Sequence, residues 1–126
     1  MNKIGYLDSL IDEWAADLMR HVHRGGYSGI NAVERILKDP GISTKISGHV
    51  VLWWPKTRRI AKMSKAMHQV SPIEQIVLVV DSGHLLNDDR SVFTKAHLAK
   101  NSSLEVRRFN DFRKKAKAKL SSILWP

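Results

Sequence analysis

Apolar residues recur every three or four positions along most of the chain, which is the period of an α-helix. The first such stretch begins near Leu7 and is closed by the pair Gly25-Gly26, a typical helix C-terminus. A second, shorter stretch has Ser28 as its predicted N-cap and Asp39-Pro40-Gly41 as its stop. We therefore predict two helices before residue 41. Their apolar positions are Leu7, Leu10, Ile11, Trp14 and Leu18, then Ile30, Val33, Ile36 and Leu37.

The helical period weakens between Ile42 and Trp53, where Gly, Ser and Thr residues indicate a loop. Pro55 then suits the first position of another helix, because proline lacks only a backbone N–H that would have no partner there. Apolar residues follow at spacings of three and four on an otherwise basic segment, so we predict that they face the core. These residues are Ile60, Met63, Met67 and Val70.

The apolar run Ile76–Val80 is ambiguous, because β-branched residues favour strands. Two features favour a helix. Ser71-Pro72 followed by Glu74 is a helix-start signal, and the chain offers no second strand to pair with this one. We predict a helix that ends at Gly83, followed by a turn at Asn87-Asp88-Asp89.

The last third of the chain predicts a short helix, a turn and a longer helix. Thr94–Lys100 forms the short helix, with Leu98-Ala99 facing inward, and Asn101-Ser102 forms the turn. Ser102 and Glu105 then fit the capping box S-x-x-E, in which each side chain satisfies the other residue's backbone N–H. The apolar positions of the longer helix are Phe109, Phe112, Ala116 and Leu120.

The predicted fold is therefore a small all-α domain. The chain has 126 residues, 43% of them hydrophobic, which suits one compact unit with a real core. We divide it into an N-terminal helical cap, 1–50, and a basic helical half, 51–126. The second half contains the helix–turn–helix at about 94–120.

The formal charge of +9 is concentrated at one end of the chain. Residues 1–50 are neutral in sum and residues 51–89 carry a net +1, whereas residues 90–126 carry +8. Charge kept only for solubility would not be confined in this way. A localised basic surface attracts polyanions and gains affinity for nucleic acid by releasing counterions. This favours nucleic acid or an acidic protein as the partner.

A short helix, a tight turn and a basic helix with a buried apolar stripe is the outline of a helix–turn–helix. In that motif the first helix crosses the phosphate backbone, and the N-terminal residues of the second helix reach base edges in the major groove. Arginine can bond guanine, and Asp or Glu can accept from cytosine. The candidate DNA-binding residues are Thr94, Lys95, Ser103, Glu105, Arg107, Arg108, Asp111, Lys114 and Lys115.

For several of these residues a purely structural role remains open. Arg107 and Arg108 could be a solvated helix face, although the motif favours base contact. Glu105 could be only a cap. Lysines further along, including Lys117 and Lys119, could meet phosphates or only solvent.

Thr94–Leu120 resembles the helix–turn–helix of region 4 of bacterial sigma factors. The residues that carry the resemblance are Thr94 at the helix start, the Leu98-Ala99 pair, Leu104 in the turn, and the apolar positions of the second helix. The segment from Ser71 to Leu78 is similar to the proline-led helix that precedes the motif in sigma factors. Two positions depart from the pattern: Ser102 stands in place of an apolar residue and Ser103 in place of the turn glycine.

The chain has no room for the other sigma regions. Trp14 and Asp17 on the first helix, the turn Gly26-Tyr27-Ser28 and the C-terminal motif together resemble the antitermination protein Q families of lambda-like phages. The resemblance implies a factor that binds DNA near a late promoter, loads onto paused RNA polymerase and reads through terminators. The implied partners are double-stranded DNA and bacterial RNA polymerase, with or without a sigma factor. Promoter activation and self-association remain open.

A second hypothesis is a helical interaction module that binds RNA polymerase or another host protein without sequence-specific DNA binding. An enzyme is not expected, because the chain lacks paired carboxylates and a phosphate-binding glycine-rich loop. Asp81-Ser82-Gly83-His84 holds nucleophile, base and acid types, but a polar helix end explains it better than a catalytic triad does. His21 and His23 are two residues apart and point to different sides of a helix, so no metal or other cofactor is expected.

The chain has no cysteine, which excludes disulfides and cysteine-based zinc sites. Its N-terminus carries acids where a signal peptide needs an apolar stretch, and its apolar runs are too short to span a bilayer. We expect a cytoplasmic protein of a bacterial host cell with no membrane contact. Trp53, Trp54 and Trp125 could seal the core or anchor a partner, and the sequence leaves both roles open.

Overall fold

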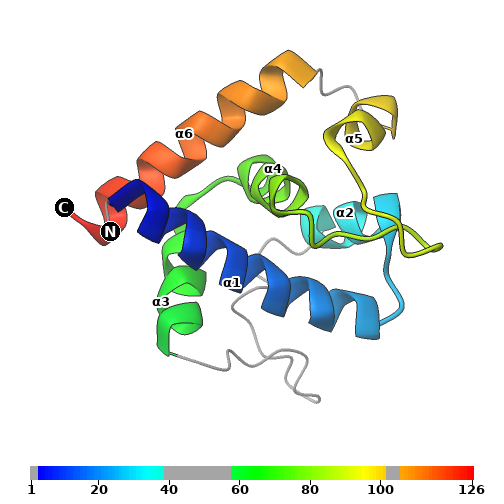
Figure 1. The fold of residues 1–126 in the computed structure, drawn as a ribbon, viewed down its shortest axis with the longest axis horizontal. Helices are drawn as coiled ribbons and strands as arrows, with labels where there is room; N and C mark the ends of the chain where they lie inside the picture. The colour runs from blue at the N-terminus through cyan, green and yellow to red at the C-terminus, as the bar shows by residue number, and fades with distance from the viewer. Residues whose placement is uncertain (1–2, 39–57, 102–105) are drawn as a thin grey trace.

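The computed structural model describes residues 3–38, 58–101 and 106–126, and over these residues the fold is all-α, as predicted (Figure 1). No β-strand occurs in the described ranges, where the only β pairing is an isolated antiparallel bridge. The helices are α1 (Lys3–Arg24), α2 (Gly29–Lys38), α3 (Arg58–Ala66), the 3₁₀ turn η1 (Met67–Gln69), α4 (Pro72–Ser82), α5 (Lys95–Asn101) and α6 (Val106–Leu124).

Helix α4 lies at the centre of the molecule and confirms the prediction for the ambiguous β-branched run. Ser71 caps it in a complete capping box with Glu74, and Pro72 occupies the first turn. Gly83 ends the helix in the left-handed conformation, with a φ of 81°. Every residue from 74 to 80 is buried. A helix that is buried all round needs no polar face, which is why its sequence lacks the alternation of a surface helix.

Helices α1, α2, α5 and α6 pack against α4, helix α3 packs against α1, and all of them share one hydrophobic core (Figure 1). The predicted apolar positions of α1 are all buried, and Trp14 is 0% exposed. Gly25 and Gly26 follow the last residue of α1, and Gly26 has a φ of 92°. The prediction that glycine ends this helix is therefore confirmed.

Helix α3 and η1 bury the predicted apolar stripe, so Ile60, Met63, Met67 and Val70 are core residues. Buried Gln75 of α4 secures this connection, since its side-chain amide donates to the carbonyls of Met67 at 2.9 Å and Val70 at 3.0 Å. The carbonyl of Met67 also accepts the N–H of Val70 at 3.1 Å, so Gln75 adds a side-chain bond to the backbone bond that closes η1.

A tight hairpin connects α4 to α5. It is closed by the bridge between Leu86 and Val92 and by the N–H of Asn87, which donates to the carbonyl of Ser91 at 2.8 Å. The predicted turn at Asn87-Asp88-Asp89 is therefore present. The N–H of Gly29 donates to the carbonyl of Leu86 at 2.8 Å, which fastens the hairpin to the start of α2.

Side chains of the α1–α2 turn hold the same hairpin. His23 accepts the N–H of Leu86 at Nε2 (3.2 Å), so its Nδ1 donates to the carbonyl of Tyr27 (2.9 Å). The hydroxyl of Ser28 donates to the carboxylate of Asp88. The predicted N-cap side chain of α2 therefore bonds across to the hairpin, while α2 begins directly after it at Gly29.

Several predicted features lie outside the described residues. They are the stop at Asp39-Pro40-Gly41, the loop at 42–53, the helix start at Pro55, and the tryptophans Trp53 and Trp54. Trp125 is described: it is half-buried against the core, and its ring contacts that of Tyr6 with centroids 5.8 Å apart.

Candidate nucleic-acid interface

Helix α5 spans Lys95–Asn101, one residue later at each end than predicted, and Thr94 precedes it as the capping residue. The N–H of Thr94 donates to Nδ1 of His97 at 3.0 Å, and the N–H of His97 donates to the hydroxyl oxygen of Thr94 at 3.4 Å. This reciprocal arrangement resembles a capping box with histidine in place of glutamate. Leu98 is buried and Ala99 is half-buried, as predicted, so α5 presents Lys95 and Lys100 to solvent.

Helix α6 contacts α4 along the predicted apolar stripe. Phe109, Ala116 and Leu120 are buried, and Phe112 is half-buried against the same core. The opposite side of the helix is exposed and holds five of the candidate DNA-binding residues. These are Arg107, Arg108, Asp111, Lys114 and Lys115.

The four cations of that exposed side have no ion-pair partner among the residues that the structure describes. Arg108 lies over the ring of its own helix neighbour Phe112, with its guanidinium carbon 5.9 Å from the ring centroid. We call these four residues the α6 cationic face: Arg107, Arg108, Lys114 and Lys115.

The other three cations of α6 are paired with acids. Arg113 lies 3.1 Å from Asp81 of α4, and Lys117 lies 2.9 Å from Asp8 of α1. Lys119 lies 2.7 Å from Glu74. The sequence left open whether Lys117 and Lys119 meet phosphates or only solvent, and the structure shows both paired with carboxylates of the same chain.

The pair of Glu74 and Lys119 is the most buried of these contacts, since the side chain of Glu74 is only 4% exposed. Burial alone would raise the pKa of Glu74. Hydrogen bonds from Lys119 and Ser71, together with the charge of Lys119, outweigh burial and lower the pKa below its usual value. Glu74 is therefore ionised at neutral pH, and it ties the N-terminus of α4 to α6.

The α6 cationic face begins where positive charge destabilises a helix. The N-terminus of a helix carries a partial positive charge, and acidic residues are favourable there. From Val106, where the described part of α6 begins, the first turn has Arg107 and Arg108 and no acidic residue. Glu105, the predicted capping acid, lies outside the described residues. No described acid therefore offsets the charge of these two arginines at this end of the helix.

The turn between α5 and α6 is only partly described. The side-chain amide of Asn101 donates to the carbonyl of His97 at 2.8 Å at the end of α5. Ser102, Ser103 and Glu105 lie outside the described residues, as does Leu104. The capping box, the two departures from the sigma pattern and the roles of Ser103 and Glu105 stay predictions.

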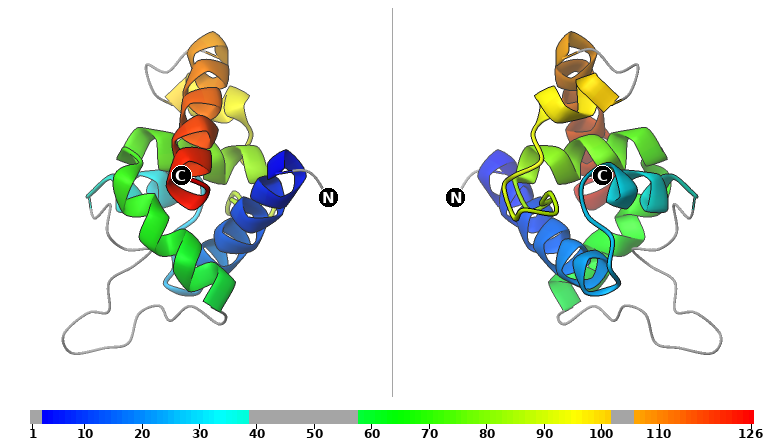
Figure 2. Two further views of the ribbon diagram at one scale, coloured as in Figure 1. Left: turned by 90° about the vertical axis from the view of Figure 1, so that its left-hand side faces the viewer. Right: turned by 90° about the vertical axis from the view of Figure 1, so that its right-hand side faces the viewer.

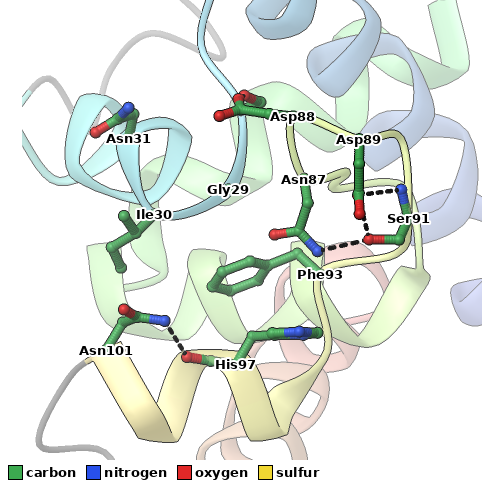
Figure 3. A pocket seen from close by; sticks show the side chains of 11 residues that line it. Gly29, Ile30, Asn31, Asn87, Asp88, Asp89, Ser91, Phe93, His97 and Asn101 are labelled. Atoms are coloured by element: carbon green, nitrogen blue, oxygen red, sulfur yellow. Dashed lines mark hydrogen bonds between the residues drawn. The ribbon is translucent and has the colours of Figure 1, made fainter.

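An open cleft of about 490 Å³ separates α2 from the hairpin and α5 (Figure 3). Its polar side chains largely bond to one another. Asp89 accepts the N–H and the hydroxyl of Ser91 at 3.0 and 2.5 Å, and Asn87 donates to that hydroxyl at 3.1 Å. The pKa of Asp89 is lowered by these bonds from Ser91. These hydrogen bonds between the side chains that line the cleft therefore stabilise the hairpin that leads into α5.

The segment Asp81-Ser82-Gly83-His84 does not have the geometry of a catalytic triad. The hydroxyl of Ser82 donates to the carbonyl of Val79 at 2.5 Å, within its own helix. The ring of His84 lies 2.8 Å from the carboxylate of Asp12 on α1. The histidine therefore ties α1 to the end of α4 and does not contact the serine hydroxyl with its ring.

The described ranges show neither a metal site nor a membrane span. They contain no group of three or more His, Asp or Glu side chains that could hold a metal ion. Nor does any helix in them combine the length and the apolar character needed to cross a membrane.

The division of the α6 cations into paired and unpaired sets was missed by sequence reasoning. One signal was available, because Arg113 and Lys117 are four residues apart and so share one side of the helix. The acids that they meet come from α1 and α4, far away in the chain, and no local pattern points to them.

Comparison with known protein families, curated proteins and solved structures found no match. The function proposed below therefore depends on the residues and their geometry.

Proposed function

We propose that the protein binds double-stranded DNA through α5 and α6 and regulates transcription. The observation that carries the proposal is the α6 cationic face, four exposed cations without a described acidic partner on a helix whose other cations are paired. Three cations of α6 are paired with acids, whereas the four of the α6 cationic face are exposed. The exposed side of α6 therefore carries a net positive charge. Phosphate backbones are the polyanions that such a surface fits.

In this proposal the first turn of α6 reads bases. Arg107 and Arg108 are exposed at the N-terminal end of the helix, where the recognition helix of a helix–turn–helix enters the major groove. Arginine can bond O6 and N7 of guanine with two hydrogen bonds. Asp111, one turn further, is exposed beside them and can accept from the amino group of cytosine.

The remaining contacts go to phosphates. Lys114 and Lys115 lie one to two turns further along α6, and Thr94 and Lys95 lie at the start of α5. All four are exposed, and Thr94 is held in the cap of α5 by the N–H of His97. Such contacts set the position of the protein on the duplex without reading sequence.

The more specific proposal is phage antitermination of the Q type. It rests on the sequence resemblance of Thr94–Leu120 to sigma region 4 and on the weaker likeness of the N-terminal helix. Loading onto RNA polymerase, in a bacterial cytoplasm, belongs to this proposal. It is tested by transcription in vitro across a terminator, on DNA from the genomic neighbourhood of the gene, with and without the protein.

DNA readout is tested with Arg107→Ala and Arg108→Ala. Each variant should lose about 1–3 kcal/mol of preference for the cognate site over unrelated DNA. Lys117→Ala is the matched control, because it also removes one positive charge from α6 but removes a paired one. Arginine variants that keep the full preference of the wild type would refute the readout.

The interaction-module hypothesis gives a different result. A protein that co-purifies with RNA polymerase but shows no salt-dependent affinity for DNA would use the helix–turn–helix only as a scaffold. In that case the α6 cationic face would bind an acidic protein surface.

A further inference from the structure

Helix α3 carries a second set of exposed cations. Arg58, Lys62 and Lys65 are all exposed, and they follow one another at spacings of four and three, so they lie along one side of the helix. The segment from Arg58 to Val70 contains no acidic residue. We call these three residues the α3 cationic face.

The sequence conceals this face, because residues 51–89 have a net charge of only +1. None of the four acids in residues 51–89 forms an ion pair with the α3 cationic face. Glu74 pairs with Lys119, and Asp81 pairs with Arg113 and lies 4.0 Å from Lys117. The remaining two, Asp88 and Asp89, lie in the hairpin, where they accept hydrogen bonds from Ser28 and Ser91.

A fourth cation of α3, Arg59, is paired with an acid, so it can serve as a control for the three unpaired cations. Arg59 lies 3.3 Å from Glu13 of α1, and its guanidinium carbon is 5.3 Å from the centroid of the Tyr6 ring. Its three neighbours of the α3 cationic face have no ion pair with any described acid. Helix α3 thus repeats the division seen in α6, with paired cations toward the body and unpaired ones toward solvent.

The two cationic faces belong to adjoining elements. Helix α3 contacts α6, and the two lie side by side at the C-terminal end of α6 (Figures 1 and 2, left). Gln69, just after α3, borders a shallow groove of about 420 Å³ together with Ala118, Lys119 and Ser122 of α6. The α6 cationic face lies toward the other end of α6, so a ligand that contacts both faces must span most of the length of that helix.

We propose that the α3 cationic face binds the phosphate backbone of the DNA that α6 reads, which extends the contact beyond the helix–turn–helix. This inference rests on the proposed function. The DNA backbone is favoured as occupant by charge complementarity, because the cations of both faces are exposed and have no ion pair with a described acid. Lysine and arginine side chains without a fixed acceptor nearby suit phosphates, which repeat along the strand and require no particular base.

The test is the salt dependence of DNA binding. Each phosphate contact contributes about 0.9 to the slope of log affinity against log salt, so Arg58→Ala/Lys62→Ala/Lys65→Ala should lower the slope by about 2.7. Affinity for cognate and unrelated DNA should fall by the same factor, because no base contact is lost. The binding constants of both DNAs are measured over a range of salt concentrations.

Arg59→Ala is the control within the same helix. It removes the same charge as Arg58→Ala but not an unpaired cation, so its salt slope should stay close to that of the wild type. Circular dichroism and urea unfolding check that all variants are folded.

Each other outcome overturns the inference in a recognisable way. A triple variant with the wild-type slope, in a protein whose Arg107→Ala variant still loses site preference, overturns the α3 contact and leaves the proposed function intact. A triple variant that keeps the DNA slope but no longer binds poly-glutamate assigns α3 to an acidic protein instead. A wild-type protein that does not bind DNA at any salt concentration overturns both proposals.

Discussion

Arg90 adopts a left-handed backbone conformation with a φ of 69°, and it is the only non-glycine residue in the described ranges with a positive φ. It closes the hairpin before α5, where its N–H donates to the carbonyl of Asn87 at 2.9 Å. Three-residue hairpin loops commonly end in such a conformation, and glycine fits it best. For a residue with a Cβ atom the conformation costs about 1–2 kcal/mol.

Replacing Arg90 by glycine should therefore stabilise the protein. Relief of the strain is partly offset by the greater entropy that glycine loses on folding, so we expect a gain of up to about 1 kcal/mol in the free energy of unfolding. Urea unfolding measures it. Arg90→Ala is the control, because it removes the same side chain but keeps the Cβ atom. Equal stability of the two variants would show that the backbone at this position is not strained.

The buried side chain of Glu74 has two roles: it completes the cap of α4, and it accepts a hydrogen bond from the ammonium group of Lys119. Glu74→Gln keeps the size of the side chain but removes the charge that Lys119 faces. We expect a loss of about 1–3 kcal/mol in the free energy of unfolding, as for other buried hydrogen bonds to charged groups. Urea unfolding at neutral pH measures this loss.

The same residue gives the protein a pH dependence. The pKa of Glu74 is lower in the folded protein than in the unfolded chain, where it is about 4.3. Its contribution to stability is therefore fully present above that pH and is lost as the pH falls through the folded value. The difference in stability between wild type and Glu74→Gln should shrink in acid. A difference that stays constant from pH 7 to pH 3 would contradict the lowered pKa.

At the scale of elements, one side of α6 carries cations that are paired with acids of other helices, and another side carries unpaired, exposed cations. Lys117 ties α6 to Asp8 of α1 at 2.9 Å, whereas Lys114 and Lys115 contact no described acid. Lys117→Ala should reduce the free energy of unfolding by about 0.2–1 kcal/mol, the usual worth of an exposed ion pair. Lys114→Ala/Lys115→Ala should leave stability nearly unchanged. Urea unfolding compares the two, and a larger loss for the double variant would reverse the assignment of the two sides.

The helices were predictable because their signals are local. The run Ile76–Val80 was assigned to a helix on the strength of Ser71, Pro72 and Glu74, and these residues form the cap that the structure shows. The apolar stripes of α1, α3 and α6 also follow from spacing alone. Period and capping depend on residues within a few positions of one another, and a single sequence contains that information.

The surface that α6 offers was not predictable in the same way. The sequence gives Lys115, Lys117 and Lys119 the same charge, but the fold brings Asp8 and Glu74 to the last two only. The α3 cationic face was not predictable for the same reason. The acids that balance its charge within residues 51–89 of the sequence lie away from α3 in the fold, against α6 or in the hairpin. Which cations remain unpaired is a property of tertiary contacts.

At the scale of the whole molecule, the fold determines which of the charged side chains behind the net charge of +9 form ion pairs and which do not. Acids of α1 and α4 pair with Arg59 of α3 and with Arg113, Lys117 and Lys119 of α6. The exposed cations of the α6 and α3 cationic faces have no ion pair with a described acid. The α1–α2 turn and the hairpin, closed by hydrogen bonds across elements, fix the start of α5. The result is a helical body whose unpaired described cations include two exposed sets, one on α6 and one on α3.

The most direct measurement of the central claim is the affinity for duplex DNA as a function of salt, for the wild type beside Lys114→Ala/Lys115→Ala. The account predicts that wild-type affinity falls steeply as salt rises and that the double variant has a slope smaller by about 1.8, with Lys117→Ala remaining like the wild type. Wild-type affinity without salt dependence, or a double variant with an unchanged slope, would contradict the claim that the α6 cationic face binds DNA.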